Sequence, residues 1–281
     1  MKLLNGKELS DNIKDKIKRI VEQMKEDGQS VCLAVIQVGD DPASSVYVGN
    51  KEKACAYVGI KSKVIKLPES VTESAIINMI ERLNITEEVN GILVQLPLPH
   101  HIDEHKVIQA IAPEKDVDGF HEINVGKFMI GEYVLEPCTA SGIIELLVRN
   151  NIEITGKNCV VVGRSNIVGK PTAMMLLHLD GTVTICHSQT KNLKEICKEA
   201  DILICAIGKP KFFNKEYVKE GAVVVDVGIH RTENGLCGDV DFDDVKDIVS
   251  AITPVPKGVG AMTVAMLMHN CVQAAHMQYG K

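Results

Sequence analysis

The chain has no tryptophan, and aromatic residues make up only 4% of its 281 positions. It also lacks any C-x-x-C pair, although it contains nine cysteines. No apolar run approaches the roughly 20 residues that a membrane-spanning helix needs. An odd number of cysteines spread through apolar segments predicts reduced, buried thiols, with neither a disulfide framework nor a metal site.

Positive charge is also scarce, because 31 Lys and Arg face 37 Asp and Glu, for a net charge of −6. General nucleic-acid binding needs a basic face, so we expect no nucleic-acid partner. The N-terminus turns polar too early for a secretory signal. We therefore predict a cytoplasmic protein without membrane contact, in which local cations and backbone dipoles hold any anionic ligand.

What the chain has in quantity is alternating strand and helix patterns. Residues 31–38 are almost all apolar, which predicts a strand covered on both faces. Residues 113–137 are predicted to be rich in loops, and Thr139 and Ser141 are predicted to cap a helix that continues through Val148. In this first half, helices are predicted near 9–24, 44–58, 72–84 and 103–111, and strands at 61–67 and 91–94.

A second series of strands and helices begins near Lys157. Strands are predicted at 158–162, 182–186, 201–205 and 222–226, and helices at 168–179, 191–198 and 262–278. Two such series predict two α/β domains with a cleft between them. Ligands of open parallel sheets bind beyond the carboxyl ends of the strands, where the motifs below are found.

The most informative motif follows the strand at 158–162 and contains Gly163, Ser165 and Gly169 in a G-x-S-x-x-x-G spacing. Backbone N–H groups of such a turn, at the start of a helix, suit a phosphate group. The same residues could also form a tight strand-to-helix turn without a ligand.

The cofactor prediction depends on the end of the next strand, near Cys186. An NAD site usually has a carboxylate there, about 20 residues past the glycine turn, and this chain has none. Arg164 and Ser188 would instead offer a guanidinium and a hydroxyl to a 2′-phosphate. The pattern favours NADP, although an exposed arginine and a capping serine would look the same.

A second motif places Tyr47 and Lys51 four residues apart, on one face of the predicted helix. A phenol and an amine can stack on a flat substrate and transfer a proton. Lysine amines are normally protonated near neutral pH, so that role requires burial or a cationic neighbour. From these two residues alone, a packed ring and a solvated amine are the commoner outcome.

Three further segments carry polar or flexible residues at candidate ligand positions. Gln95 follows the apolar strand at 91–94, and Asp118 lies in a charged turn at 113–120. The loop 253–263 is rich in Pro and Gly, which lets backbone approach a ligand closely. Each segment could also be an ordinary surface feature.

Taken together and in this order, the segments resemble the bifunctional methylenetetrahydrofolate dehydrogenase/cyclohydrolase family. The resemblance spans roughly residues 38–269. The matching stretches are Tyr47-Val48-x-x-Lys51, Val94-Gln95-Leu96-Pro97-Leu98-Pro99, Lys115-Asp116-Val117-Asp118-Gly119-Phe120, Val162-Gly163-Arg164-Ser165 and Thr253-Pro254-Val255-Pro256 with Gly258-Val259-Gly260.

The resemblance implies two α/β domains around a cleft, the second a Rossmann-type NADP-binding domain, with the C-terminal helix returning to the first domain. It implies a folate-binding catalytic domain at 1–140 plus 262–281, an NADP-binding domain at 141–261, and a homodimer. The implied reactions belong to one-carbon folate metabolism. They are NADP-dependent oxidation of 5,10-methylenetetrahydrofolate to the methenyl cation, and hydrolysis of that cation to 10-formyltetrahydrofolate.

The resemblance also implies residue roles. Lys51 would be the acid/base of the hydrolysis with Gln95 as its hydrogen-bonding partner, while Tyr47 stacks on the aminobenzoate ring and Asp118 holds the pterin. Other implied folate contacts are Val94, Leu96, Pro256, Gly258, Val259 and Gly260, and the implied cofactor contacts are Gly163, Arg164, Ser165, Ser188 and Ile229.

Two alternatives stay open at this point. Another NADP-dependent two-domain dehydrogenase, such as one of the shikimate type, would explain the α/β pattern and Arg164, with Lys51 as its base. The second alternative is a protein that binds a dinucleotide or a folate without catalysis. The presence of Tyr47, Lys51 and Gln95 together argues against it.

Overall fold

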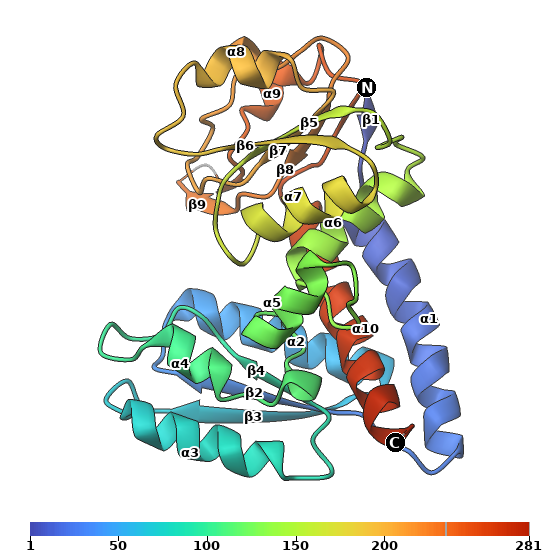
Figure 1. Ribbon diagram of the computed structural model, residues 1–281, viewed down its shortest axis with the longest axis vertical. Helices are drawn as coiled ribbons and strands as arrows, with labels where there is room; N and C mark the ends of the chain where they lie inside the picture. Colours follow the sequence, from blue (N-terminus) through green and yellow to red (C-terminus); the bar gives the residue numbers. More distant parts are fainter. Residues whose placement is uncertain (234, 281) are drawn as a thin grey trace. The chain divides into compact units, whose positions relative to one another are not determined.

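A computed structural model describes residues 1–233 and 235–280 of the protein (Figure 1). The chain forms two compact units, each built around a parallel sheet. One unit contains Asp11–Glu136 and the segment from Val264 onward, and the other contains Met1–Ser10 and Pro137–Thr263. The predicted fold class is confirmed, including the return of the C-terminal helix to the unit formed by the first half of the chain.

The first unit has a sheet of strand order β3-β2-β4, with all neighbours parallel. Its strands are β2 (Cys32–Val38), β3 (Lys61–Leu67) and β4 (Gly91–Val94). The crossover helices are α2 (Pro42–Val58) and α3 (Glu73–Asn84). Every residue of β2 is buried, as the continuous apolar run predicted, because helices cover both faces of this central strand.

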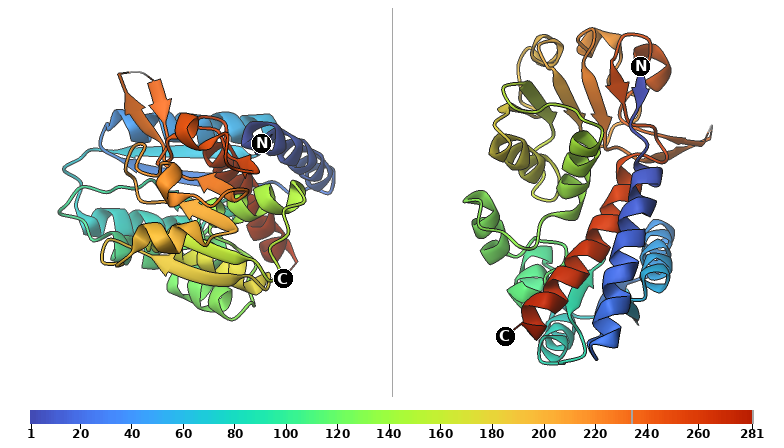
Figure 2. Two further views of the ribbon diagram at one scale, coloured as in Figure 1. Left: turned by 90° about the horizontal axis from the view of Figure 1, so that it is seen from above. Right: turned by 90° about the vertical axis from the view of Figure 1, so that its right-hand side faces the viewer.

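Alternate residues of β2 point to opposite faces of the sheet. Ala34 and Ile36 pack in one core with α3 and with residues near α4 (Glu104–Gln109). On the other side lie α2, α1 (Gly6–Glu26) and α10 (Val259–Tyr279), and α10 runs beside α1 in both figures (Figures 1 and 2). Cys55 of α2 and Met268 of α10 are in sulfur–sulfur contact at 3.6 Å.

The second unit has the strand order β1-β11-β8-β7-β5-β6, again with parallel neighbours. The helices α6 (Cys138–Arg149) and α7 (Gly169–His178) pack together on one side. A core around the fully buried Phe213 joins the sheet to the helical elements of the other side. The strands are β1 (Lys2–Leu3), β5 (Asn158–Val162), β6 (Thr182–Cys186), β7 (Ile202–Cys205), β8 (Val223–Asp226) and β11 (Ala251–Ile252). The helical elements of the second side are α8 (Leu193–Lys198), the 3-10 turn η2 (Lys215–Tyr217) and α9 (Phe242–Val245).

Several local predictions were wrong. The segment 113–137 contains a 3-10 turn, η1 (Pro113–Lys115), and the helix α5 (Glu122–Met129). Helix α6 begins after Pro137 without a side-chain cap, so Thr139 and Ser141 lie inside the helix and do not cap it. The sequence also gave no sign of α9, β1, β11 or the antiparallel strands β9 (His230–Thr232) and β10 (Gly235–Cys237).

The cysteines are mostly as predicted. Eight thiols are buried, and burial raises the pKa of several of them, to about 12 for Cys55 and Cys197. Cys237 is partly exposed, which corrects the expectation of a buried thiol at that position. Within 1–233 and 235–280, no helix is both long enough and apolar enough to cross a bilayer.

Candidate active site

Helix α2 carries the first two predicted site residues. Asp41 caps it by accepting a 2.7 Å hydrogen bond from Ser44 N, Pro42 fills the first turn, and Gly59 ends it with a left-handed φ of 84°. Tyr47 and Lys51 lie one turn apart on this helix, as predicted. Tyr47 is 44% exposed, so its side chain is available to a ligand.

Lys51 and Gln95 are in direct contact, although 44 residues separate them in sequence. Lys51 Nζ donates to Gln95 Oε1 at 2.9 Å. The Gln95 amide is oriented by its other end, where Nε2 donates to the carbonyl oxygen of Leu96 at 2.7 Å. The backbone N–H of Gln95 continues the ladder to Ile36 O at 2.8 Å, so the end of β4 fixes where this acceptor lies.

Asp118 completes this group from the turn at 113–120. Burial raises the pKa of Asp118 to about 6, the positive charge of Lys51 opposes the rise, and the nearby Asp116 adds to it. The structure thus brings Lys51, Gln95 and Asp118 together within one unit. Val94 and Leu96 line a small pocket with Asp118 and Phe120, so these predicted contacts also lie side by side.

The three residues before Asp118 are anchored at separate points. Lys115 is buried and donates to the carbonyl oxygens of Leu83 and Thr86, at 3.2 and 2.9 Å. Asp116 accepts from His121 N at 2.8 Å and from Asn124 Nδ2 at 2.9 Å, and Val117 O accepts from Asn270 Nδ2 at 2.9 Å. This segment therefore presents Asp118 in one fixed position.

Gly91 shows how tightly the segment packs on the sheet. A Cβ at Gly91 would lie 2.6 Å from Val117 Cγ1, and Asp116 pairs with Ile92 as an extension of the ladder. Lys115 and Asn270 were missed as supporting residues. The buried position of Lys115 and the distant contact of Asn270 leave no local sequence signal.

In the second unit, the predicted phosphate turn follows β5. Gly163 has a φ of 146°, and a Cβ there would lie 2.3 Å from Ala206 O. A Cβ on Gly169 would lie 2.2 Å from Gly163 O. Both glycines are therefore required by close backbone packing, which brings the start of α7 against the end of β5.

The helix N-terminus is partly capped from within the turn. Ser165 Oγ accepts from the N–H groups of Val168 and Gly169, at 3.2 and 3.3 Å. A hydroxyl that accepts two such bonds keeps its own hydrogen to donate. Arg164, Ser165 and Ser188 are all exposed, so a guanidinium and two hydroxyls are open to an anion at this edge of the sheet.

The last predicted segment surrounds Gly258. A Cβ on Gly258 would lie 2.4 Å from Pro254 O, and a Cβ on Gly260 would lie 2.9 Å from Ile229 Cδ1. Ile229, 40% exposed, therefore lies beside the predicted folate segment. Val259 and Gly260 belong to the first turn of α10, and not to the loop that the sequence predicted. Pro256, which follows a cis peptide bond, and Gly258 precede the helix.

Sequence reasoning missed a group of buried polar side chains behind this edge. Asp226, at the end of β8, and Asp239 are both buried, and His230 Nε2 lies 2.8 Å from Asp239 Oδ1. Burial raises the pKa of Asp226 to about 7. Hydrogen bonds from the backbone N–H groups of Val240 and Asp239 stabilise the charged form and so oppose this rise. Asp226 ends β8 and Asp239 lies two residues beyond β10, and a position near a strand end is the sequence signal that could have indicated them.

The fold and these two clusters define an α/β enzyme with a dinucleotide-type binding edge on one sheet and an amine–amide–carboxyl group on the other. Residues 4–118 match the family model described as tetrahydrofolate dehydrogenase/cyclohydrolase, catalytic domain. Residues 137–279 match the model of the NAD(P)-binding domain of the same family. The chain belongs to the tetrahydrofolate dehydrogenase/cyclohydrolase family, as the sequence predicted.

Individual relatives agree with this assignment. The bifunctional protein FolD of Lachnoclostridium phytofermentans is 62% identical over 274 residues, 97% of each chain. The crystal structure of FolD from Campylobacter jejuni is 48% identical, with a TM-score of 0.97 over 99% of both chains. The Trypanosoma brucei FolD structure, described as complexed with NADP cofactor and inhibitor, is 37% identical, with a TM-score of 0.95 over 99% of this chain and 98% of that one.

The comparisons also decide between the alternatives. Shikimate dehydrogenase from Aquifex aeolicus shares only the fold, at 15% identity and a TM-score of 0.54 over 90% of this chain and 93% of that one. Membership of a family with both a catalytic and an NAD(P)-binding domain confirms the predicted bifunctional enzyme class and its nicotinamide dinucleotide cofactor.

Proposed function

We propose that this chain oxidises 5,10-methylenetetrahydrofolate to the 5,10-methenyl cation with NADP and then hydrolyses the cation to 10-formyltetrahydrofolate. The observation that carries this proposal is the 2.9 Å hydrogen bond between Lys51 Nζ and Gln95 Oε1, with Asp118 close enough to Lys51 for their charges to interact. The family membership supports the same pair of reactions.

Lys51 handles the proton of the hydrolysis. Attack of water on the methenyl carbon releases a proton, and a positioned amine can accept it. The substrate is itself a cation, so a second positive charge beside it is unfavourable. Gln95 Oε1 accepts from Lys51 and so holds the amine in one orientation.

Asp118 and Tyr47 position the substrate. A carboxyl group with a pKa of about 6 is mostly ionised above pH 7, so Asp118 can accept hydrogen bonds from the N–H groups of a pterin. The exposed ring of Tyr47 stacks on the aminobenzoate ring. Val94 and Leu96 line the pocket beside Asp118, while Pro256, Gly258, Val259 and Gly260 contribute further folate contacts.

The second unit fits a dinucleotide. The collisions that a Cβ would cause at Gly163 and Gly169 indicate that packing within this unit requires both glycines, as the strand-to-helix turn of dinucleotide-binding sheets does. Arg164, Ser165 and Ser188 would hold the phosphates, with Arg164 and Ser188 on the 2′-phosphate, and Ile229 would lie beside the cofactor. When bound, NADP supplies the acceptor for the hydride that leaves the folate.

The remaining features are proposed from the family resemblance. The folate-binding catalytic domain would comprise 1–140 plus 262–281, and the NADP-binding domain 141–261. The enzyme would act as a homodimer in the cytoplasm.

Absorbance of the methenyl cation tests the function directly. Mixing the protein with 5,10-methylenetetrahydrofolate and NADP should produce the cation and NADPH. In a separate experiment without any dinucleotide, added methenyl cation should decay faster with the protein than in buffer alone. A protein that binds NADP and folate but changes neither signal would be a binding protein without catalysis. NADPH formation from shikimate would instead support the other dehydrogenase.

A further inference from the structure

The Asp239 carboxylate of the second unit has four polar partners. The residue is fully buried, yet its oxygens accept from three consecutive backbone N–H groups. Oδ2 accepts from Ile207 at 2.7 Å and Gly208 at 3.0 Å, and Oδ1 accepts from Lys209 at 2.8 Å. A buried carboxylate is costly unless hydrogen bonds compensate it, and bonds to a charged acceptor are about twice as strong as neutral ones.

These bonds join two loops that follow neighbouring strands. Residues 206–209 come after β7, and Ala206 of this loop touches Gly163 of the predicted phosphate turn. His230 follows β8 and lies 2.8 Å from Asp239 Oδ1. A Cβ on Gly228 would lie 2.4 Å from the same oxygen, so that glycine is required by the carboxylate. Asp239 therefore contacts both neighbours of Ile229 in the chain.

Successive backbone N–H groups that converge on one point usually bind an anion from outside. Here Asp239 fills that position from within the fold, so the loop 206–209 is held in one conformation before any ligand binds. Ligands of parallel α/β sheets bind beyond the carboxyl ends of the strands, where this loop and Ile229 lie.

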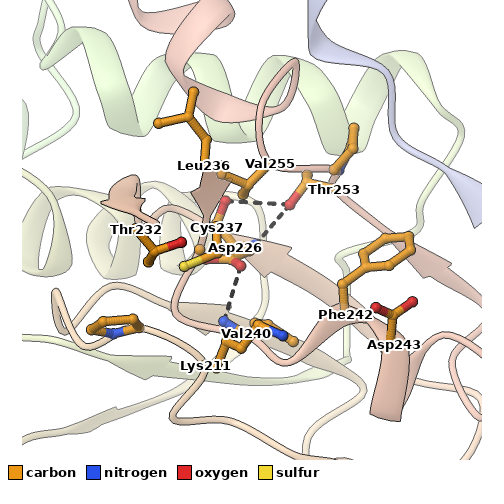
Figure 3. A pocket seen from close by; sticks show the side chains of 13 residues that line it. Lys211, Asp226, Thr232, Leu236, Cys237, Val240, Phe242, Asp243, Thr253 and Val255 are labelled. Atoms are coloured by element: carbon orange, nitrogen blue, oxygen red, sulfur yellow. Dashed lines mark hydrogen bonds between the residues drawn. The ribbon is translucent and has the colours of Figure 1, made fainter. Parts of the chain in front are cut away.

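A second buried carboxylate holds Asp239 in turn. Asp226 Oδ1 accepts from Asp239 N at 2.8 Å, and Oδ2 accepts from Val240 N at 3.0 Å. Thr253 Oγ1 accepts from Asp226 N at 2.7 Å. Asp226, Val240 and Thr253 line a pocket of about 540 Å³ (Figure 3). A Cβ on Gly238 would lie 1.9 Å from Asp226 Oδ2, so the two carboxylates and the chain between them form one packed block.

We infer that Asp239 is a positioning residue for the dinucleotide, which holds the loop 206–209 and the segment 228–230 in the conformation that the cofactor needs. The inference rests on the proposed function, because it takes NADP as the ligand of this edge. The hydrolysis consumes no dinucleotide, so loss of Asp239 should affect the dinucleotide and leave the hydrolysis intact.

The test compares Asp239→Asn with the wild type by calorimetric titration of NADP. Asparagine keeps the size but presents an NH₂ group where an acceptor is needed, so the loop loses its anchor. The dissociation constant of NADP should rise about tenfold or more, because small misplacements of binding groups are costly. Hydrolysis of the methenyl cation, which requires no NADP, should stay within about twofold of the wild type.

Two further variants keep the test interpretable. Asp241→Asn removes a neighbouring carboxylate that pairs with Lys211 at the surface, and it should leave NADP affinity unchanged. His230→Gln keeps the Asp239 carboxylate and its three backbone bonds, and it should weaken NADP less than Asp239→Asn does. If Asp239→Asn does not fold, a loss of NADP affinity in the folded His230→Gln variant carries the test.

Three outcomes of these experiments would contradict the inference or its premise. Normal NADP affinity in folded Asp239→Asn, or in His230→Gln if only that variant folds, overturns the inference but leaves the proposed function intact. Equal losses of NADP affinity and hydrolysis mean that Asp239 has only a general structural role, which also overturns it. A wild-type protein that binds no NADP removes the proposed cofactor itself.

Discussion

Replacing Asp118 with asparagine should make the protein more stable while removing a substrate contact. Burial raises the pKa of this carboxyl from 3.8 to about 6, with Lys51 opposing the rise and Asp116 adding to it. The folded state therefore disfavours the charged form, and asparagine, which has nearly the same shape, carries no charge to disfavour.

The sign of the pH dependence follows from proton binding. Between about pH 4 and pH 6 the folded protein holds a proton at Asp118 that the unfolded chain has released, so the stability of the wild type falls as the pH rises through this interval. The pKa difference of about 2 corresponds to about 3 kcal/mol above pH 7. Solvent screens the partly exposed side chain, which reduces this value. We therefore expect Asp118→Asn to raise the free energy of unfolding by about 1–3 kcal/mol at pH 8 and by about half as much at pH 5.

Urea unfolding of the ligand-free protein at pH 5 and pH 8 measures this difference. The matched control is Glu87→Gln, which removes an exposed carboxylate of the same unit. It should change the free energy of unfolding only slightly, and by the same amount at pH 5 and pH 8. A gain for Asp118→Asn that is the same at both pH values, or a loss of stability at pH 8, would refute the reasoning. Folate turnover should fall in the same variant, as expected where a site residue is kept at a cost in stability.

Three other substitutions test separate parts of the structure. Arg164→Ala should weaken NADP by about tenfold or more and NAD by much less, whereas Lys170→Ala should not discriminate; equal losses by calorimetry would reject the 2′-phosphate role. Gly163→Ala should destabilise the protein by about 2–4 kcal/mol in urea, because its Cβ would lie 2.3 Å from Ala206 O, and near wild-type stability would contradict this packing. Lys115→Met should cost about 1–3 kcal/mol because it removes two hydrogen bonds from a charged donor to the Leu83 and Thr86 carbonyl groups; an unchanged urea midpoint would show that the anchor contributes nothing.

The sequence predicted the main strands and crossover helices well, because a run such as 31–38 has an apolar pattern that only a covered strand satisfies. Short elements were missed because they contain too few residues to show such a pattern. Helix α5 spans only Glu122–Met129, and β11 spans only Ala251–Ile252, so neither is long enough to show a period.

The site was predicted unevenly. The spacing of Tyr47 and Lys51 follows from the helix, but the contact of Lys51 with Gln95 joins residues 44 positions apart and was expected only from the family resemblance. The Asp239 group was missed altogether, because an aspartate after a strand end looks like a surface residue until its burial is known. Long-range burial is the information that a single sequence does not carry.

The central claim is that the amine of Lys51 handles the proton in the hydrolysis of the methenyl cation. The most direct measurement is the decay of methenyl absorbance, without NADP, for the wild type, Lys51→Met and the matched variant Lys53→Met, whose lysine is exposed on the same helix. The account predicts that Lys51→Met loses about 100-fold or more of the enzymatic rate and that Lys53→Met stays near the wild type. Hydrolysis by Lys51→Met at close to the wild-type rate would contradict it.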